Sequence, residues 1–290
     1  MPSPNIYVGG KNMTVKAQDV SYKKEMLKKL RCFVLDMDGT IYLGNELFPF
    51  TPEFLETVKA VGKDYCFFTN NSSRNPKMYA DKLRNFGISN VGDEDVCISN
   101  EVAIRYIKAN YENPRVFVLG TPALIENFEA RGITIDEENP NLMVLGFDTT
   151  LSYDRLSRFC QFVRDGVDYI GVNADLNCPM EGGKFIPDCG SIARLVESST
   201  GRFPEFFGKP SPYTLKFIVD RTGLKEEEIA FVGDRLYTDI AVTENSDATS
   251  IFVLTGEGTL EEAINGPHKP DLIMESLAEI TALLKEIYNK

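Results

Sequence analysis

The chain contains a single histidine, His268, and none of its six cysteines forms a Cys-x-x-Cys pair. Structural zinc sites draw on cysteine and histidine at short spacings, so the sequence argues against such a site. Cys32, Cys66 and Cys97 stand in apolar runs and are predicted to be buried thiols of a reducing compartment. His268 lies in a loop-like stretch, and we assign it no catalytic part.

Basic residues are also scarce, since 31 lysines and arginines face 43 acidic residues for a net charge of −12. Nucleic acids and anionic membranes require a basic surface, so neither is expected as the main partner. An anionic ligand would need a bound cation or a focused lysine or arginine. No apolar run approaches the length of a membrane span, and the first twenty or so residues do not resemble a signal peptide. We therefore expect a cytoplasmic protein.

The sequence is rich in apolar runs that alternate with amphipathic segments. Strands are predicted at 32–35, 65–69, 95–99, 229–233 and 249–256. Helices are predicted at 21–30, 50–62, 76–87, 100–111, 213–223 and 274–288, with a further helix after Asp239. In the helix at 50–62, Thr51 is predicted as the N-cap and Pro52 as the first residue. This alternation predicts an α/β fold with a doubly wound, Rossmann-like parallel sheet.

The middle of the chain repeats the alternation as a separate unit. Its strands are predicted at 115–120, 132–136, 142–147 and 168–173, and its helices at 121–132, 152–166 and 190–201. A chain of 290 residues exceeds the usual size of one domain. We predict an N-terminal extension with a short helix at 1–30, whose first twenty residues form an arm or tail. The catalytic core is predicted at 31–110 and 206–290, with an α/β domain inserted at 111–205.

Four acidic residues follow apolar strands of the predicted core. Asp36 and Asp38 are two residues apart, so in an extended chain their side chains point the same way. Asp234 ends another strand, and Asp239 follows it. Alone, each motif is typical of a solvated turn or a helix cap. Together they supply oxygen ligands from two strand ends, which suits Mg²⁺.

Two other stretches offer groups that can bind an anion. Thr69 and Asn70 follow an apolar strand with a hydroxyl and an amide. Lys209 stands between Gly208 and Pro210 before a predicted helix, where it can meet an anion as a point charge. Each alone is more typical of a polar turn or a solvated lysine.

The ordered set D-M-D-G-T, T-N-N-S, G-K-P and G-D-R-L-Y-T-D-I resembles the haloacid dehalogenase (HAD) superfamily of phosphohydrolases. The resemblance runs from about residue 30 to the end. It is strongest to the branch with a large α/β cap, which includes NagD-type, p-nitrophenyl phosphate and pyridoxal phosphate phosphatases. The segment 186–212 looks particularly like NagD.

The resemblance implies roles for the residues that match the motifs. Asp36 would be the nucleophile that becomes an aspartyl phosphate, and Asp38 the general acid/base. Mg²⁺ would be the cofactor, held by Asp36, the backbone carbonyl of Asp38 and Asp234, with support from Asp239. The phosphate-orienting residues would be Thr69, Asn70 and Lys209. The expected activity is hydrolysis of a small-molecule phosphomonoester.

The inserted domain would select the substrate in this branch, through a loop expected within 171–192. Its candidate contacts to the leaving group are Asn173, Asp175, Lys184, Asp188 and Cys189. Each of these is at least as compatible with an ordinary turn or a solvated loop. Caps of this kind often form homodimers, so a homodimer through the cap is expected as well.

A second class of function stays open, a non-catalytic phospho-acceptor or Mg²⁺-binding regulatory module on the same fold. Receiver domains of that class also combine an acidic cluster with a Thr or Ser and a Lys. They lack the D-x-D pair and the inserted cap. A dehalogenase would need neither Asp38 nor Asp234, and a phosphomutase is disfavoured by the cap type.

Overall fold

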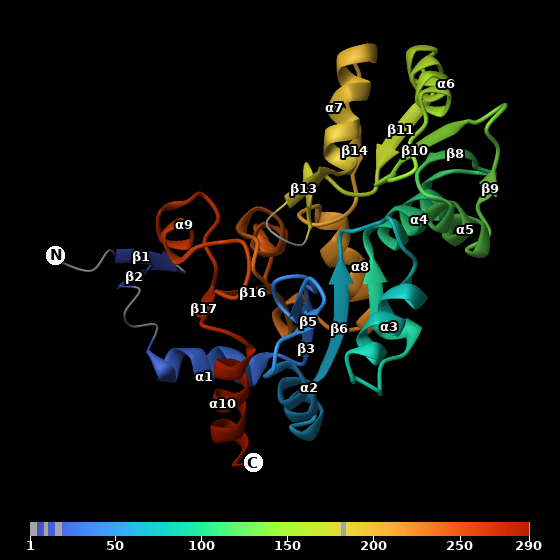
Figure 1. Cartoon of the computed structure of the whole chain (residues 1–290). Helices are drawn as coiled ribbons and strands as arrows, with labels where there is room; N and C mark the ends of the chain where they lie inside the picture. Colours follow the sequence, from blue (N-terminus) through green and yellow to red (C-terminus); the bar gives the residue numbers. More distant parts are fainter. Residues whose placement is uncertain (1–4, 9–10, 15–18, 181–183, 290) are drawn as a thin grey trace. The chain divides into compact units, whose positions relative to one another are not determined.

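A computed structural model describes residues 5–8, 11–14, 19–180 and 184–289, and Figure 1 shows its helices and strands. Contacts divide the chain into two units. The first comprises Met1–Phe68, Phe86–Ser89 and Ile218–Lys290, and the second comprises Thr69–Asn85 and Asn90–Phe217. These bounds differ from the predicted domains, because most of the chain between residues 69 and 110 groups with the second unit.

Five strands of the first unit form a parallel sheet, separate from the antiparallel pair of β4 (Tyr42–Leu43) and β5 (Glu46–Leu47). In spatial order they are β17 (Leu272–Met274), β16 (Thr249–Val253), β15 (Ile229–Gly233), β3 (Cys32–Leu35) and β6 (Asp64–Thr69). Every neighbouring pair is parallel. All residues of β3, β15, β16 and β17 are buried. Burial on both faces explains why these strands read as continuous apolar runs rather than as an alternating pattern.

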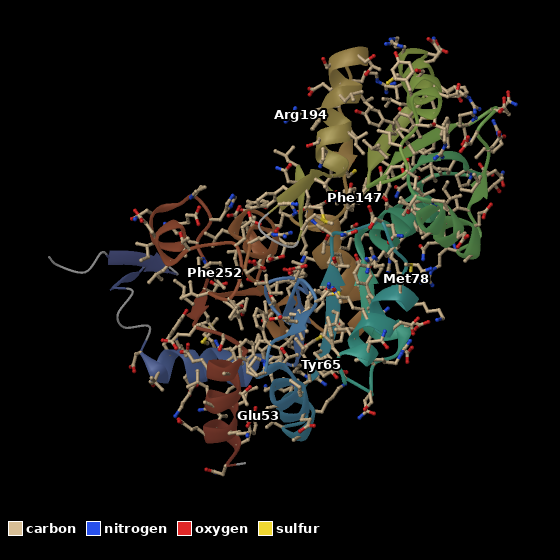
Figure 2. The ribbon with its side chains drawn as sticks, in the orientation of Figure 1. Glu53, Tyr65, Met78, Phe147, Arg194 and Phe252 are labelled. Carbon is tan, nitrogen blue, oxygen red and sulfur yellow. The ribbon has the colours of Figure 1, made fainter. Side chains whose placement is uncertain are left out.

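Helices cover this sheet. Those described are α1 (Val20–Lys29), α2 (Thr51–Ala60), α9 (Leu260–Asn265) and α10 (Leu277–Tyr288), and α8 (Pro212–Thr222) enters from the second unit. Helix α10 packs against both α1 and α2 (Figure 1). Ion pairs tie the three together, Lys23 with Glu279 at 2.5 Å and Lys285 with Glu53 at 2.6 Å. Glu53 is labelled in Figure 2.

The segment after β15 departs from the predicted helix. It forms one π-helical turn, η5 (Leu236–Ile240), and a 3-10 turn, η6 (Ala241–Thr243). The carbonyl of Arg235 accepts from the amides of both Asp239, at 2.9 Å, and Ile240, at 3.3 Å. The bond from Ile240, and another from the amide of Ala241 to the carbonyl of Leu236, span five residues, as in a π-turn. The prediction of an α-helix after Asp239 was therefore wrong.

Two further local predictions need correction. Thr51 is the first residue of α2 rather than its N-cap, which is Phe50. The Thr51 hydroxyl donates to the carbonyl of Ile41 at 2.8 Å instead of capping the helix. The N-terminal stretch expected as an arm contains the antiparallel strands β1 (Asn5–Val8) and β2 (Lys11–Thr14).

The second unit has its own parallel sheet. Its strands lie in the order β14 (Glu205–Phe206), β11 (Asp168–Gly171), β10 (Leu142–Leu145), β8 (Arg115–Leu119) and β9 (Thr134–Ile135). Pairs along this sheet are parallel. The antiparallel hairpin of β12 (Asn177–Met180) and β13 (Lys184–Pro187) follows β11.

Further elements belong to the second unit. They are α3 (Pro76–Asn85), η2 (Asp93–Asp95), β7 (Val96–Ile98), α4 (Ser99–Asn110), α5 (Pro122–Ala130), α6 (Tyr153–Arg164) and α7 (Cys189–Thr200). Helix α7 packs beside α6, and Arg194 of α7 (Figure 2) lies over the ring of Phe203, 4.1 Å from its centroid.

The loop after β6 groups with the second unit because its polar groups bond there. The Ser72 hydroxyl donates to Asn173 Oδ1 at 3.1 Å and accepts from the amide of Phe147 at 3.0 Å. The hydroxyl of Thr121 donates to the carbonyl of Ser73 at 3.0 Å. These bonds fix the loop to residues that follow β8, β10 and β11.

The structure confirms the α/β class and its parallel sheets. Cys32, Cys66 and Cys97 are buried and free, as predicted. No helix in the described part of the chain combines the length and the apolar character needed to cross a bilayer.

The packing of the first unit generates a stability prediction. Phe33 of β3 is fully buried, with its ring centroid 5.8 Å from that of Phe54 in an edge-on arrangement. We expect Phe33→Ala to lower the free energy of unfolding by about 3–5 kcal/mol in urea denaturation, because it opens a cavity. Lys285→Ala, which removes one exposed ion pair with Glu53, should lower it by less than about 1 kcal/mol. Equal losses in both variants would contradict this assignment of the core.

Candidate active site

Asp36 lies directly after β3, where the chain leaves the sheet. Its amide still donates to the carbonyl of Val232 in β15 at 2.8 Å, and the residue is only 8% exposed. The following residues form a tight turn in which the carbonyl of Met37 accepts from the amide of Ile41 at 2.9 Å. Asp38 lies within this turn and forms an isolated β-bridge with Tyr42.

Asp36, Asp234 and Asp239 come together in the first unit. Strands β3 and β15 are parallel with Leu35 opposite Val232, so Asp36 and Asp234 emerge at the same edge of the sheet. One carboxylate oxygen from each of the three residues lies within 4.8 Å of the others, and all three residues are buried. The side chain of Asp38 is outside this group.

Local bonds hold two of these carboxylates in place. Asp234 Oδ2 accepts from the amide of Glu257 at 2.6 Å, and the carbonyl of Asp234 accepts from the amide of Gly258 at 3.0 Å. Asp239 Oδ2 accepts from the amide of Arg235 at 3.0 Å. Asp234 Oδ1 is buried and has no hydrogen-bond partner among the described residues.

The proximity of these acids shows in the pKa of Asp234. Burial and, next, the charge of Asp239 raise the pKa of Asp234 from 3.8 to about 7. An ionised carboxylate without a counter-charge is unfavourable in such a place. Three buried carboxylates and an unbonded oxygen therefore fit a hard divalent cation, which takes oxygen ligands at close range.

Gly39 makes room for this arrangement. It has φ +92°, in the left-handed region, and a Cβ at this position would overlap the carboxylate of Asp234. Only glycine meets both conditions without strain. The glycine of the D-M-D-G-T motif is thus required by its neighbour across the sheet edge as much as by its own turn.

The predicted phosphate-binding residues belong to the second unit, which is described by itself. Thr69 is the last residue of β6, and its hydroxyl accepts from the amide of Asn71 at 3.2 Å. Lys209 is 2% exposed. Asn70 bonds the backbone of Lys209 twice, since Nδ2 donates to the Lys209 carbonyl and Oδ1 accepts from the Lys209 amide, both at 2.8 Å.

Most candidates for leaving-group contacts bond within the second unit. Asp175 Oδ2 accepts from Asn70 Nδ2 at 2.8 Å and from Asn173 Nδ2 at 3.0 Å. Asp188 Oδ1 accepts from Asn173 Nδ2 at 3.0 Å and is the N-cap of α7. The thiol of Cys189 donates to the carbonyl of Leu145 at 3.4 Å, and burial raises its pKa well above the usual value.

Lys184 differs from those four because it is exposed, at the start of β13. The predicted specificity segment 171–192 includes residues 181–183, which lie outside the described residues. A role in contacting the leaving group stays a prediction for all five candidates.

Sequence reasoning missed the loop after β16. The amides of Glu257 and Gly258 bind Asp234, and the Thr255 hydroxyl donates to the carbonyl of Gly39 at 2.5 Å. The signal was present in T-G-E-G, because two glycines directly after an apolar strand permit close backbone approach to a neighbour.

Two family descriptions match parts of this chain, and both are of haloacid dehalogenase-like hydrolases. The description "Haloacid dehalogenase-like hydrolase" matches residues 33–134, and "HAD-hydrolase-like" matches residues 206–280. A curated relative, a 5'-nucleotidase of Bacillus subtilis (strain 168), is 32% identical over 253 residues, which are 87% of this chain and 98% of the relative.

Solved structures give similar matches. A 4-nitrophenylphosphatase from Thermotoga maritima is 45% identical with a TM-score of 0.85, covering 89% of this chain and 98% of its own. A glycerol phosphate phosphatase from Mycobacterium tuberculosis, in complex with magnesium, is 27% identical with a TM-score of 0.81, covering 89% and 79%.

Gly39 has a matched control elsewhere in the first unit. Gly62 also has a positive φ, +74°, but a Cβ there would meet nothing within 4 Å. Gly62→Ala should lower the free energy of unfolding by about 1–2 kcal/mol through backbone strain alone. Gly39→Ala should lower it by about a further 1–3 kcal/mol, because the added methyl displaces Asp234. Urea denaturation measures both, and equal losses would rule out the overlap with Asp234.

The raised pKa of Asp234 predicts a dependence of stability on pH without metal. Between 3.8 and about 7 the folded state holds a proton that the unfolded state has released, so stability falls as the pH rises through this window. In chelator, we expect the Tm of the unmutated protein to fall relative to that of Asp234→Asn between about pH 4 and pH 7. The exposed control Asp154→Asn should keep the unmutated slope. Parallel curves for the unmutated protein and Asp234→Asn would contradict the shift.

Proposed function

We propose a function from the premise that this chain belongs to the haloacid dehalogenase-like hydrolases. It is a phosphoric monoester hydrolase, in keeping with relatives named as a 5'-nucleotidase and a 4-nitrophenylphosphatase. More specifically, we propose a Mg²⁺-dependent phosphatase of small phosphomonoesters that acts through an aspartyl phosphate on Asp36. The cluster of Asp36, Asp234 and Asp239, with its unbonded Asp234 oxygen, carries this proposal.

Asp36 is the proposed nucleophile. A carboxylate oxygen of Asp36 attacks phosphorus and the bond from phosphorus to the leaving oxygen breaks, while Asp38 gives that oxygen its proton. Asp38 then takes a proton from water, which attacks phosphorus, releases inorganic phosphate and restores the Asp36 carboxylate. A covalent intermediate divides one difficult step into two easier ones. A placed proton donor contributes about 10²–10⁴-fold.

Asp36, Asp234 and the backbone carbonyl of Asp38 would hold the cation, and Asp239 would support it. When bound, Mg²⁺ supplies positive charge against the phosphoryl oxygens. The two aspartates after β3 then have separate tasks. Asp36 lies within the carboxylate group, whereas Asp38 is not a member of it, and proton transfer is the task proposed for the Asp38 side chain.

Thr69, Asn70 and Lys209 are proposed to orient the phosphoryl group. Two hydrogen bonds between the Asn70 side chain and the backbone of Lys209 hold that backbone, and so the base of the lysine side chain, in place. A fixed lysine suits phosphoryl transfer, which depends mainly on positioning and on neutralising charge. With a net charge of −12, the chain needs such a local cationic group to attract a phosphate ester.

We propose that residues 111–205 act as the substrate-selecting cap. The curated and structural relatives act, by their names, on nucleotides, 4-nitrophenyl phosphate and glycerol phosphate. These leaving groups share little beyond small size, so the proposal for this chain is a small phosphomonoester. Lys184, as an exposed cation on β13, is the candidate with the best access to a polar leaving group.

Release of inorganic phosphate from 4-nitrophenyl phosphate and a panel of phosphorylated metabolites tests the proposal. We expect activity that needs Mg²⁺ and disappears in excess chelator. Asp36→Asn should abolish turnover, and Asp38→Asn should slow it by about 10²–10⁴-fold while keeping Mg²⁺ binding. Asp154→Asn, an exposed position, is the control.

Two results would argue against this assignment. Full activity in Asp36→Asn would remove the proposed nucleophile. Stable phosphorylation of the unmutated protein without turnover would favour a phospho-acceptor module instead.

A further inference from the structure

A buried polar network surrounds Asn70 in the second unit. Asn70 Nδ2 has two hydrogens, and both are used, one to the carbonyl of Lys209 and one to Asp175 Oδ2, each at 2.8 Å. Asn70 Oδ1 accepts from the amide of Lys209 at 2.8 Å. The carbonyl of Asn70 accepts from the hydroxyl of Ser99 at 2.9 Å. The side-chain amide is therefore fully bonded.

Asp175 and the backbone of Lys209 together set which way this amide faces. An ionised carboxylate only accepts hydrogen bonds, so the group that Asn70 turns to Asp175 must be its NH₂. Its oxygen is then left for the amide of Lys209. With the amide reversed, Asn70 would present an oxygen to the Asp175 carboxylate and to the Lys209 carbonyl, and a donor to the Lys209 amide. Each of the three contacts would then bring two acceptors or two donors together.

The space around Asn70 leaves little room for adjustment. A Cβ on Gly208 would lie 2.6 Å from Asn70 Oδ1 and 2.8 Å from the carbonyl of Val172. Asp175 is 6% exposed and Asn173 is fully buried. A buried network of this kind loses its geometry when one member changes from acceptor to donor, because no water can take over the bond.

We propose that Asp175 is a positioning residue of the phosphate site. It acts through the Asn70 amide to fix the backbone of Lys209. The inference rests on the proposed function, in which Lys209 binds the phosphoryl group. It assigns Asp175 a task other than contact with the leaving group.

Asp148 provides a control in the same unit. It is 5% exposed, and its Oδ1 accepts from the amide and the hydroxyl of Thr150 at 2.8 Å and 2.7 Å. Like Asp175 it is a buried carboxylate that accepts hydrogen bonds, but these bonds stay within its own turn. Loss of either carboxylate removes a buried acceptor, whereas of the two only Asp175 bonds the Asn70 amide.

The experiment compares Asp175→Ala with Asp148→Ala in the full chain at saturating Mg²⁺. Isothermal titration calorimetry gives the dissociation constant for inorganic phosphate, and 4-nitrophenyl phosphate gives KM and kcat. We expect Asp175→Ala to weaken phosphate binding and raise KM by about tenfold or more, because it leaves the Asn70 amide with an unsatisfied buried donor. Asp148→Ala should stay within about threefold on both measures, and both variants should keep the Mg²⁺ concentration for half-maximal thermal stabilisation.

The outcomes separate this inference from the proposed function. An unmutated protein that hydrolyses the ester, with equal phosphate binding in the two variants, overturns the role of Asp175 alone. An unmutated protein that neither hydrolyses esters nor binds phosphate overturns both. Should Asp175→Ala fail to fold by circular dichroism, Asp175→Ser takes its place with the same expectations, since it also removes the carboxylate.

Discussion

Mutual repulsion of three buried carboxylates is the constraint around which the first unit is organised. Asp36 and Asp234 meet because β3 and β15 are parallel neighbours in register, and Asp239 joins them through a widened turn. Amides of the loop after β16 face Asp234, and Gly39, which has no Cβ, leaves room for the Asp234 carboxylate. Each element keeps negative charge concentrated where a divalent cation can neutralise it. Burial first, and the charge of Asp239 next, raise the pKa of Asp234 in this place.

The second unit has a different requirement, which is a fixed backbone position for Lys209 and the residues around it. Lys209 is almost fully buried, and its backbone is bonded by an asparagine that also bonds a carboxylate. A long side chain thus begins from a backbone held by hydrogen bonds, so less conformational freedom would be lost in its proposed role of binding an anion. Rigidity here comes from satisfied polar groups rather than from apolar packing.

Patterns local in sequence were predictable, and those that depend on distant partners were not. The apolar runs of β3 and β15 indicated buried parallel strands, and the D-x-D pair indicated their functional edge. The π turn at η5 arises from the Arg235 carbonyl bonding two amides, which no residue pattern announces. Asp175 read as a loop residue, because its partner Asn70 is 105 residues away. The grouping of most residues between 69 and 110 with the second unit also depends on distant partners, since Ser72 and Ser73 bond to residues after β8, β10 and β11.

The attachment of the loop after β6 to the second sheet bears on how this protein can be recombined with its relatives. A chimera that exchanged residues 111–205 alone would separate Ser72 from Asn173 and Asn70 from Asp175. The imported segment would then face a loop adapted to a different set of donors and acceptors. Exchanging this insertion between family members therefore calls for exchanging the four residues from Asn70 to Ser73 together with it.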